Sequence, residues 1–253
     1  MISTGYPYTA ATEVMDLKDS NVTCEDLKNF TMEIRGAVGA NLASTPIICG
    51  GYFDNYGTHI RSEKCFKYMD GGWQHFATMI ERRSYAVGIV YNNAFHIFGG
   101  YEHDDNDAAG TTFQSSEIIK EDGISIKGPQ LPTPLFQHAI AYINSTTSII
   151  TGGQTSDNSY NDKTWYFNHV SQKFQRGPDL LEVRDSKYYV EVIESHASGS
   201  VTDQETKEKM AIIAGGIIDM AYSNSTKMLL NGEWKAGKTH TESHICLFVY
   251  TFS

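Results

Sequence analysis

The sequence predicts an all-β fold built from repeated four-stranded units, and three observations support this prediction. Short segments rich in β-branched and aromatic residues, such as 84–91 and 94–100, lie between turn residues, as strands do. No window of useful length shows the apolar periodicity of a helix. Glycine doublets end four apolar segments at intervals of 49, 53 and 63 residues. A marker that recurs at such a period indicates a repeat architecture.

The glycine doublets set the register of the repeat. They are Gly50 and Gly51, Gly99 and Gly100, Gly152 and Gly153, and Gly215 and Gly216. Glycine permits backbone conformations and a close approach of strands that a Cβ would block. The strand-to-helix context of a phosphate-binding loop does not surround any of them. We therefore predict a structural role for the doublets.

Each unit is expected to supply four strands in order. The first follows an arginine position, the second ends in the doublet, the third carries aromatic residues, and the fourth begins near a tryptophan. The interval of 16 residues from Arg83 to Gly99 recurs from Phe136 to Gly152. Arg83, Phe136, Arg184 and His244 each lie ten residues after a tryptophan position, and we predict that they share one repeat position with Arg35. Units of four strands and about 50 residues are typical of the blades of a β-propeller.

Segments 50–83 and 152–184 resemble kelch repeats, because each carries a doublet, a spaced aromatic residue, an aromatic residue at the tryptophan position and a following arginine. The resemblance extends from about residue 4 to residue 244, and it implies a single kelch-type β-propeller domain over residues 1–253. Galactose oxidase shares this type of repeat. The cysteine-bearing segments are also similar to those of secreted invertebrate kelch-type proteins. Three residues depart from the pattern: Cys24, Ile126 and Phe136.

The ends of the chain bear on the number of blades. The N-terminal residues are expected to form the last strands of a blade, and residues 244–252 a lone first strand. If these strands pair, a ring of about five blades closes and leaves no open strand edge. Otherwise the chain is a fragment of a six-bladed propeller. The sequence leaves both alternatives open.

The other repeat markers are expected to stabilise the repeat. Trp73 and Trp234 should pack between adjacent blades, where burial of aromatic area contributes much of the stability. Arg83 and Arg184 should donate hydrogen bonds to backbone carbonyls between blades. The alternative is a ring of arginines at the mouth of the channel that binds a ligand.

Cysteines and glycosylation motifs bear on the compartment. Cys49 precedes a doublet and Cys65 begins the next strand, so a hairpin would bring the two sulfurs together in a disulfide; two buried thiols are the alternative. Four Asn-x-Ser/Thr motifs make candidate glycosylation sites of Asn21, Asn29, Asn144 and Asn224. The first residues do not resemble a signal peptide. We expect an extracellular protein if the native leader is missing from this sequence, and a cytoplasmic one otherwise.

Composition argues against several classes of function. The 20 Lys and Arg residues face 30 Asp and Glu, a net charge of −10, which argues against nucleic-acid binding. No segment is apolar enough to span a membrane. Neither a catalytic signature nor a convincing set of metal ligands occurs, so we expect no enzyme, no metal and no cofactor.

The function expected from the sequence is that of a monomeric protein-protein interaction module. The loops that follow the doublets are polar and held by a rigid scaffold, which suits recognition of a protein or peptide. We predict a partner with basic groups, contacted by Tyr52, Tyr56, Tyr101, Asp104, Asp105 and Tyr160. The alternatives are a propeller enzyme of the galactose-oxidase-like or sugar-isomerase kind, and the substrate-recognition part of a ubiquitin-ligase adaptor.

Overall fold

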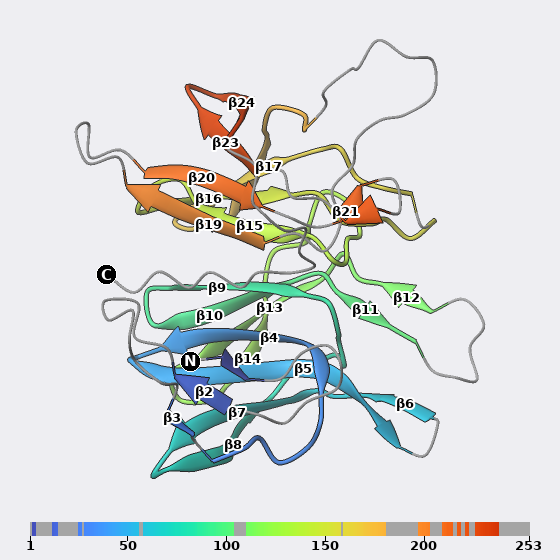
Figure 1. Ribbon diagram of the computed structural model, residues 1–253, viewed down its shortest axis with the longest axis vertical. Helices are drawn as coiled ribbons and strands as arrows, with labels where there is room; N and C mark the ends of the chain where they lie inside the picture. Colours follow the sequence, from blue (N-terminus) through green and yellow to red (C-terminus); the bar gives the residue numbers. More distant parts are fainter. Residues whose placement is uncertain are drawn as a thin grey trace. The chain divides into compact units, whose positions relative to one another are not determined.

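The computed structural model describes residues 28–55, 58–103, 110–157, 159–180, 197–202, 209–214 and 226–237, and five short strands outside these ranges. All regular secondary structure among these residues is β, and every strand pair is antiparallel (Figure 1). The described part of the chain contains no helix that could cross a membrane. The chain divides into two compact units, Met1–Gln130 and Leu131–Ser253.

The first unit contains a sheet with the strand order β4-β5-β7-β8. Two-residue turns join its outer pairs, at Ala43 and Ser44 and at Asp70 and Gly71, and all four residues have a positive φ. Such turns match the twist of the strands they join. β6 pairs with the far end of β5. The strands are β4 (Arg35–Leu42), β5 (Thr45–Asn55), β6 (Thr58–Arg61), β7 (Lys64–Met69) and β8 (Gly72–Thr78).

A second sheet of this unit has the order β14-β13-β10-β9, with a small hairpin of β11 and β12 beyond β10. A three-stranded sheet, β1-β2-β3, comes from the N-terminal residues. The strands are β9 (Val87–Tyr91), β10 (Ala94–Phe98), β11 (Tyr101–Glu102), β12 (Thr111–Thr112), β13 (Ser116–Lys120) and β14 (Ser125–Lys127), and β1 (Ile2–Ser3), β2 (Thr12–Val14) and β3 (Glu25–Asp26).

The core of the first unit lies between its two four-stranded sheets. Apolar side chains from β4, β5 and β7 meet those of β10 and β13 there, and they include Val38, Leu42, Ile47, Phe95, Ile97 and Ile119. A second cluster places Trp73 against Phe30, with ring centroids 5.4 Å apart. These contacts fix the positions of the first strands of neighbouring sheets. The candidate site depends on those positions, because its residues come from both sheets.

The second unit contains two further four-stranded sheets, ordered β15-β16-β17-β18 and β19-β20-β23-β24, and the hairpin β21-β22. Ala141, Ile149 and Ala211 form their shared core, and Trp234 packs against it. The strands are β15 (Ala139–Tyr142), β16 (Thr147–Thr151), β17 (Trp165–Asn168), β18 (Lys173–Arg176), β19 (Ala197–Thr202), β20 (Lys209–Ala214), β21 (Ile217–Ile218), β22 (Ala221–Tyr222), β23 (Thr226–Leu230) and β24 (Glu233–Ala236).

The all-β prediction is confirmed, and the described part of the chain contains four sheets of four consecutive main strands, as the repeat requires. The segment 244–252, which would supply a closing strand, lies outside the described residues. The same holds for Gly215, Gly216 and Arg184. The number of blades and the single domain over residues 1–253 therefore stay predictions.

The described doublets occupy backbone positions that require glycine. Gly51, Gly100 and Gly153 have φ values of +84°, +101° and +83°. A Cβ at these positions would lie 2.9, 2.8 and 2.6 Å from the carbonyl oxygens of Arg35, Ser84 and Phe136. Each doublet thus lets the end of the second strand approach the backbone that leads into a first strand.

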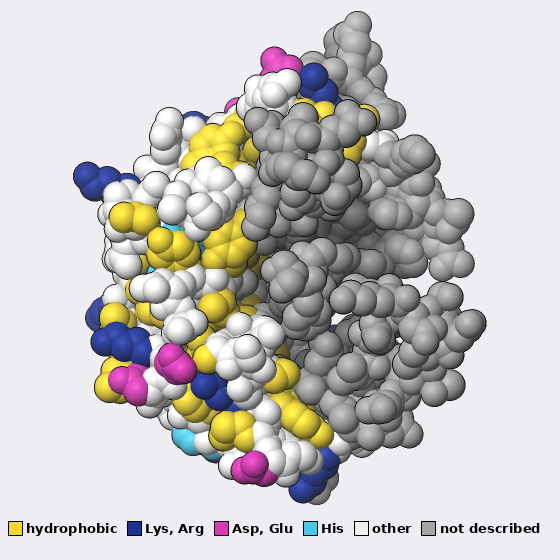
Figure 2. Space-filling view, turned by 90° about the vertical axis from the view of Figure 1, so that its left-hand side faces the viewer, with side chains coloured by type: hydrophobic (Ala, Val, Ile, Leu, Met, Phe, Trp, Pro, Cys, Tyr) yellow, Lys and Arg dark blue, Asp and Glu magenta, His cyan; other side chains and the backbone are white. Residues whose placement is uncertain are grey.

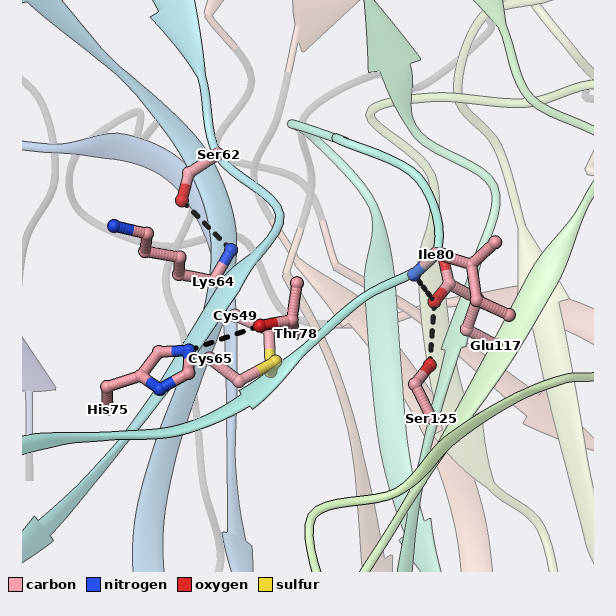
Figure 3. Close-up of a disulfide and its surroundings, with 9 residues drawn as sticks. All are labelled: Cys49, Ser62, Lys64, Cys65, His75, Thr78, Ile80, Glu117 and Ser125. Carbon is pink, nitrogen blue, oxygen red and sulfur yellow. Dashed lines mark hydrogen bonds between the residues drawn. A yellow bond between two sulfur atoms is a disulfide. The ribbon is translucent and has the colours of Figure 1, made fainter.

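The predicted disulfide is present. Cys49 on β5 is the cross-strand partner of Cys65 on β7, and their sulfurs are bonded (Figure 3). Both residues are fully buried. The hairpin expected from the spacing therefore brings the two side chains to the same side of the sheet.

Candidate functional site

The strand pairing corrects the predicted arginine position. Arg35 pairs with Tyr52, the residue after the first doublet. Ser84 pairs with Tyr101 and Phe136 with Gln154 in the same way, so Arg35 is equivalent to Ser84 and Phe136. Arg83 stands one residue earlier in the repeat. The equal 16-residue spacing was misleading, because the segment between the paired residues Phe136 and Gln154 is one residue longer than that between Ser84 and Tyr101.

Arg83 is a structural arginine. Its guanidinium is fully buried and donates to the carbonyl oxygens of Gly99 at 2.6 Å and Ser115 at 3.2 Å. It also pairs with the Glu117 carboxylate at 2.7 Å. The Arg83 carbonyl accepts a hydrogen bond from Gly51 in the preceding sheet, at 2.9 Å. The backbone of residue 83 thereby joins the two sheets, whereas its side chain bonds groups of the second sheet and the segment that leads into it.

Glu117 completes this network, and the sequence analysis did not single it out. Its carboxylate accepts hydrogen bonds from the Ile80 amide at 2.6 Å and the Ser125 hydroxyl at 2.9 Å (Figure 3). The residue is 1% exposed. A carboxylate directly before the apolar pair Ile118 and Ile119 was the available signal, since a buried charge needs a partner.

Arg35 has a different environment. Its guanidinium carbon lies 4.8 Å from the centre of the Tyr52 ring, and its Nε donates to the Tyr52 hydroxyl. That hydroxyl is 2.6 Å from the hydroxyl of Tyr85. Tyr52 is 3% exposed, whereas Arg35 and Tyr85 are half-buried. The arginine thus lies between a buried phenol and solvent.

Arg61 extends this arrangement. It lies on β6 directly opposite Tyr52, with its guanidinium carbon 5.0 Å from the Tyr52 ring centre and 6.0 Å from that of Tyr101. We refer to Arg35, Tyr52, Arg61, Tyr85 and Tyr101 as the tyrosine–arginine cluster. All five lie at the end of the first unit's sheets where the doublets stand. Neighbouring Glu102 pairs with Arg82 at 3.0 Å.

The backbone at Tyr85 explains how its ring reaches the cluster. Tyr85 has a φ of +55°, in the left-handed region that bulky residues rarely adopt. Its amide donates to the Gly36 carbonyl at 2.7 Å. A Cβ on Gly36 would lie 3.2 Å from the Tyr85 ring. The absence of a side chain at Gly36 makes room for that ring.

Burial raises the pKa of Tyr52 to about 12, and the hydrogen bond to Tyr85 acts in the same direction. The guanidinium of Arg35 lowers the pKa by a smaller amount. The phenol therefore stays protonated around neutral pH. It can donate or accept a hydrogen bond there, but it does not act as a base.

The structure brings together only part of the predicted partner-binding set. Tyr52 and Tyr101 lie in one cluster, joined by Arg61. Tyr160 belongs to the second unit, where it pairs with Gln154. Three others, Tyr56, Asp104 and Asp105, lie outside the described residues. Arg61 was not predicted to join this set, because we expected a polar loop after the doublet, where the structure pairs β6 with β5.

Two other kinds of binding site are a basic surface patch and a group of metal ligands. On the face drawn in Figure 2, Lys and Arg side chains are scattered rather than gathered in one continuous patch. Within the described ranges, no group of three or more His, Cys, Asp or Glu residues could hold a metal ion. Among the described residues, the tyrosine–arginine cluster brings two guanidinium groups together with three tyrosine side chains.

Comparisons with known proteins support the fold alone. No protein-family model matches this chain. No curated protein matches it either. Among solved structures, the chain is similar to YjhT, with a TM-score of 0.75 and 12% sequence identity. The match covers 96% of this chain and 87% of that chain. The fold is therefore shared with YjhT over almost the entire sequence.

Proposed function

We propose that the chain is a kelch-type β-propeller and that it acts as a non-catalytic binding module for a protein or peptide. The sequential four-stranded sheets, the doublets at their ends and the likeness to YjhT support the propeller. The observation that carries the binding role is the tyrosine–arginine cluster, in which two guanidinium groups lie over tyrosine rings.

The cluster suits a partner that presents an acidic group. Guanidinium groups bind carboxylates through charge-assisted hydrogen bonds that are often bidentate. Tyrosine and arginine are also the residue types enriched in interfaces and in their energetic hot spots. The hydroxyl of Tyr52 helps to hold Arg35 in place before a ligand arrives, which lowers the entropic cost of binding. This proposal differs from the expectation of a partner with basic groups, which rested on Asp104 and Asp105, outside the described residues.

The chemistry of the cluster favours binding over catalysis. A general base or acid works best with a pKa close to the working pH. Burial moves the pKa of Tyr52 in the opposite direction, to about 12. Its hydroxyl is well suited to a stable hydrogen bond and poorly suited to proton transfer. We therefore propose a binding module in preference to a sugar-processing enzyme.

A random peptide library displayed on phage tests this proposal. The intact chain, immobilised, should enrich peptides rich in Asp and Glu, and Arg61→Gln should abolish the enrichment. Arg176→Gln is the matched control, because Arg176 also lies over an aromatic ring, 5.6 Å from the centre of Trp165, but in another sheet. Enrichment of basic peptides, equal enrichment on Arg61→Gln, or no enrichment at all would each contradict the proposal.

A further inference from the structure

The hairpin between β15 and β16 carries a glycosylation motif at its tip. Asn144, Ser145 and Thr146 form the motif, and Asn144 and Ser145 are exposed. The amides of Ile143 and Asn144 both donate to the Thr147 carbonyl, at 3.0 and 3.2 Å, and close the turn. The motif therefore lies on an ordered projection of the second unit and not within its core.

The side-chain geometry of this turn leaves the reactive atom accessible. Oδ1 of Asn144 accepts hydrogen bonds from the Thr146 amide at 2.9 Å and from the Thr146 hydroxyl at 3.2 Å. Both bonds use the oxygen of the Asn144 amide group. Its nitrogen, Nδ2, donates no hydrogen bond to any described residue and belongs to an exposed side chain.

The motif at Asn29 also has an exposed asparagine, but its middle residue is buried. Its central residue, Phe30, is 4% exposed and packs against Phe66 and Trp73, with ring centroids 5.0 and 5.4 Å apart. A glycan on Asn29 would thus begin beside a residue of the core. Two further motifs, at Asn21 and Asn224, lie outside the described residues.

The buried disulfide is a second, independent observation. Cys49 and Cys65 are both 0% exposed and bonded to each other. Structural disulfides form and persist in oxidising compartments such as the secretory pathway, where N-glycans are also attached. The two observations concern different units of the chain and point to the same compartment.

We propose that Asn144 carries an N-linked glycan and that the chain matures in the secretory pathway. In the transfer, Nδ2 of Asn144 forms a bond to the anomeric carbon of an oligosaccharide linked to a lipid diphosphate. The bond between that carbon and the diphosphate oxygen breaks, the lipid diphosphate leaves, and the proton lost from the amide passes to the transferase and then to solvent. No oxidation or reduction is involved.

The position of Asn144 fits the proposed binding function. The β15–β16 turn precedes β16, whereas Gly152 and Gly153 follow it. A glycan at Asn144 therefore leaves the doublet end of its own sheet uncovered. The modification would shield the opposite end of that sheet and keep the doublet end available for a partner.

Native protein from its source, with its own leader, provides the test. Enzymatic removal of N-glycans in ¹⁸O-labelled water converts an occupied Asn to labelled Asp, which peptide mass spectrometry detects. We expect label at Asn144 and a disulfide between Cys49 and Cys65. Absence of label at Asn144, or reduced cysteines, would overturn the proposal.

Two variants produced in secreting eukaryotic cells isolate the motif itself. Thr146→Ala removes the hydroxyl that the motif requires and keeps Asn144, so it should eliminate the glycan. Ser145→Ala changes the exposed middle residue and keeps the motif, so occupancy should match that of the unaltered chain. Occupancy that survives Thr146→Ala, or is lost in Ser145→Ala, would contradict the assignment. Peptide binding is measured separately, so a failure here does not bear on the proposed function.

Discussion

Two arginines of the first unit, Arg83 and Arg35, show how the same residue type can serve stability in one place and recognition in another. Arg83 is fully buried and bonds two carbonyl oxygens and a buried carboxylate. Arg35 is half-buried and contacts the ring and hydroxyl of a tyrosine. They differ by one register position. That single step separates an arginine whose side chain is fully buried and bonded to the second sheet from a half-buried one whose side chain lies over an aromatic ring.

The largest expected effect comes from removing Arg83. Arg83→Met leaves the Glu117 carboxylate buried without its guanidinium, which should lower the free energy of unfolding by about 3 to 5 kcal/mol. Arg35→Met should cost about 1 kcal/mol or less, as expected for a partly exposed cation–π contact. Urea denaturation of the three proteins gives both values.

A double variant sharpens this test. Replacing Arg83 and Glu117 together by Met removes the buried charge pair but leaves the Gly99 carbonyl and the Ile80 amide without these partners, so only part of the lost stability should return. If Arg35→Met destabilised the chain as strongly as Arg83→Met, the distinction between the two arginines would be wrong.

The next effect concerns the phenol that Arg35 contacts. Because the folded state raises the pKa of Tyr52 from 10.0 to about 12, the unfolded chain loses this proton first as pH rises. The contribution of the protonated Tyr52 phenol to the free energy of unfolding is complete below pH 10. It should fall by roughly 2 to 3 kcal/mol between pH 10 and 12. The measurement is the difference in unfolding free energy between the unaltered chain and Tyr52→Phe across this range. A difference that stays constant or grows with pH would contradict the assignment.

A small effect on stability is expected at Gly36. Gly36→Ala places a Cβ at a φ of +67° and 3.2 Å from the Tyr85 ring, and it should cost about 1 kcal/mol. Gly71→Ala is the control, because Gly71 has a similar φ of +74° and nothing within 4 Å of its Cβ position. Urea denaturation should show a similar loss of unfolding free energy for the two variants. Only Gly36→Ala should weaken binding of a selected acidic peptide, since it displaces Tyr85.

Features that depend on local residue patterns could be predicted from the sequence. The doublets were recognisable because a Cβ at Gly51, Gly100 or Gly153 would collide with backbone atoms at a positive φ. The expected hairpin made the Cys49–Cys65 disulfide one of two alternatives, and the structure contains it. The arginine register was not recoverable, because one extra residue before the third doublet produced a coincidental spacing. The contact between Tyr52 and Tyr85 was also not predictable, since it joins residues on different sheets. It depends on how those sheets pack, and no spacing rule describes that.

The central claim is that the tyrosine–arginine cluster recognises an acidic partner while the Arg83 network stabilises the fold. The most direct test measures, on the same samples, the unfolding free energy and the Kd for one acidic peptide taken from the selection. Arg35→Gln should weaken binding by roughly 10- to 100-fold, as expected for the loss of a charge-assisted hydrogen bond, with little change in stability. A variant that unfolds more easily yet binds the peptide with unchanged Kd would contradict the claim.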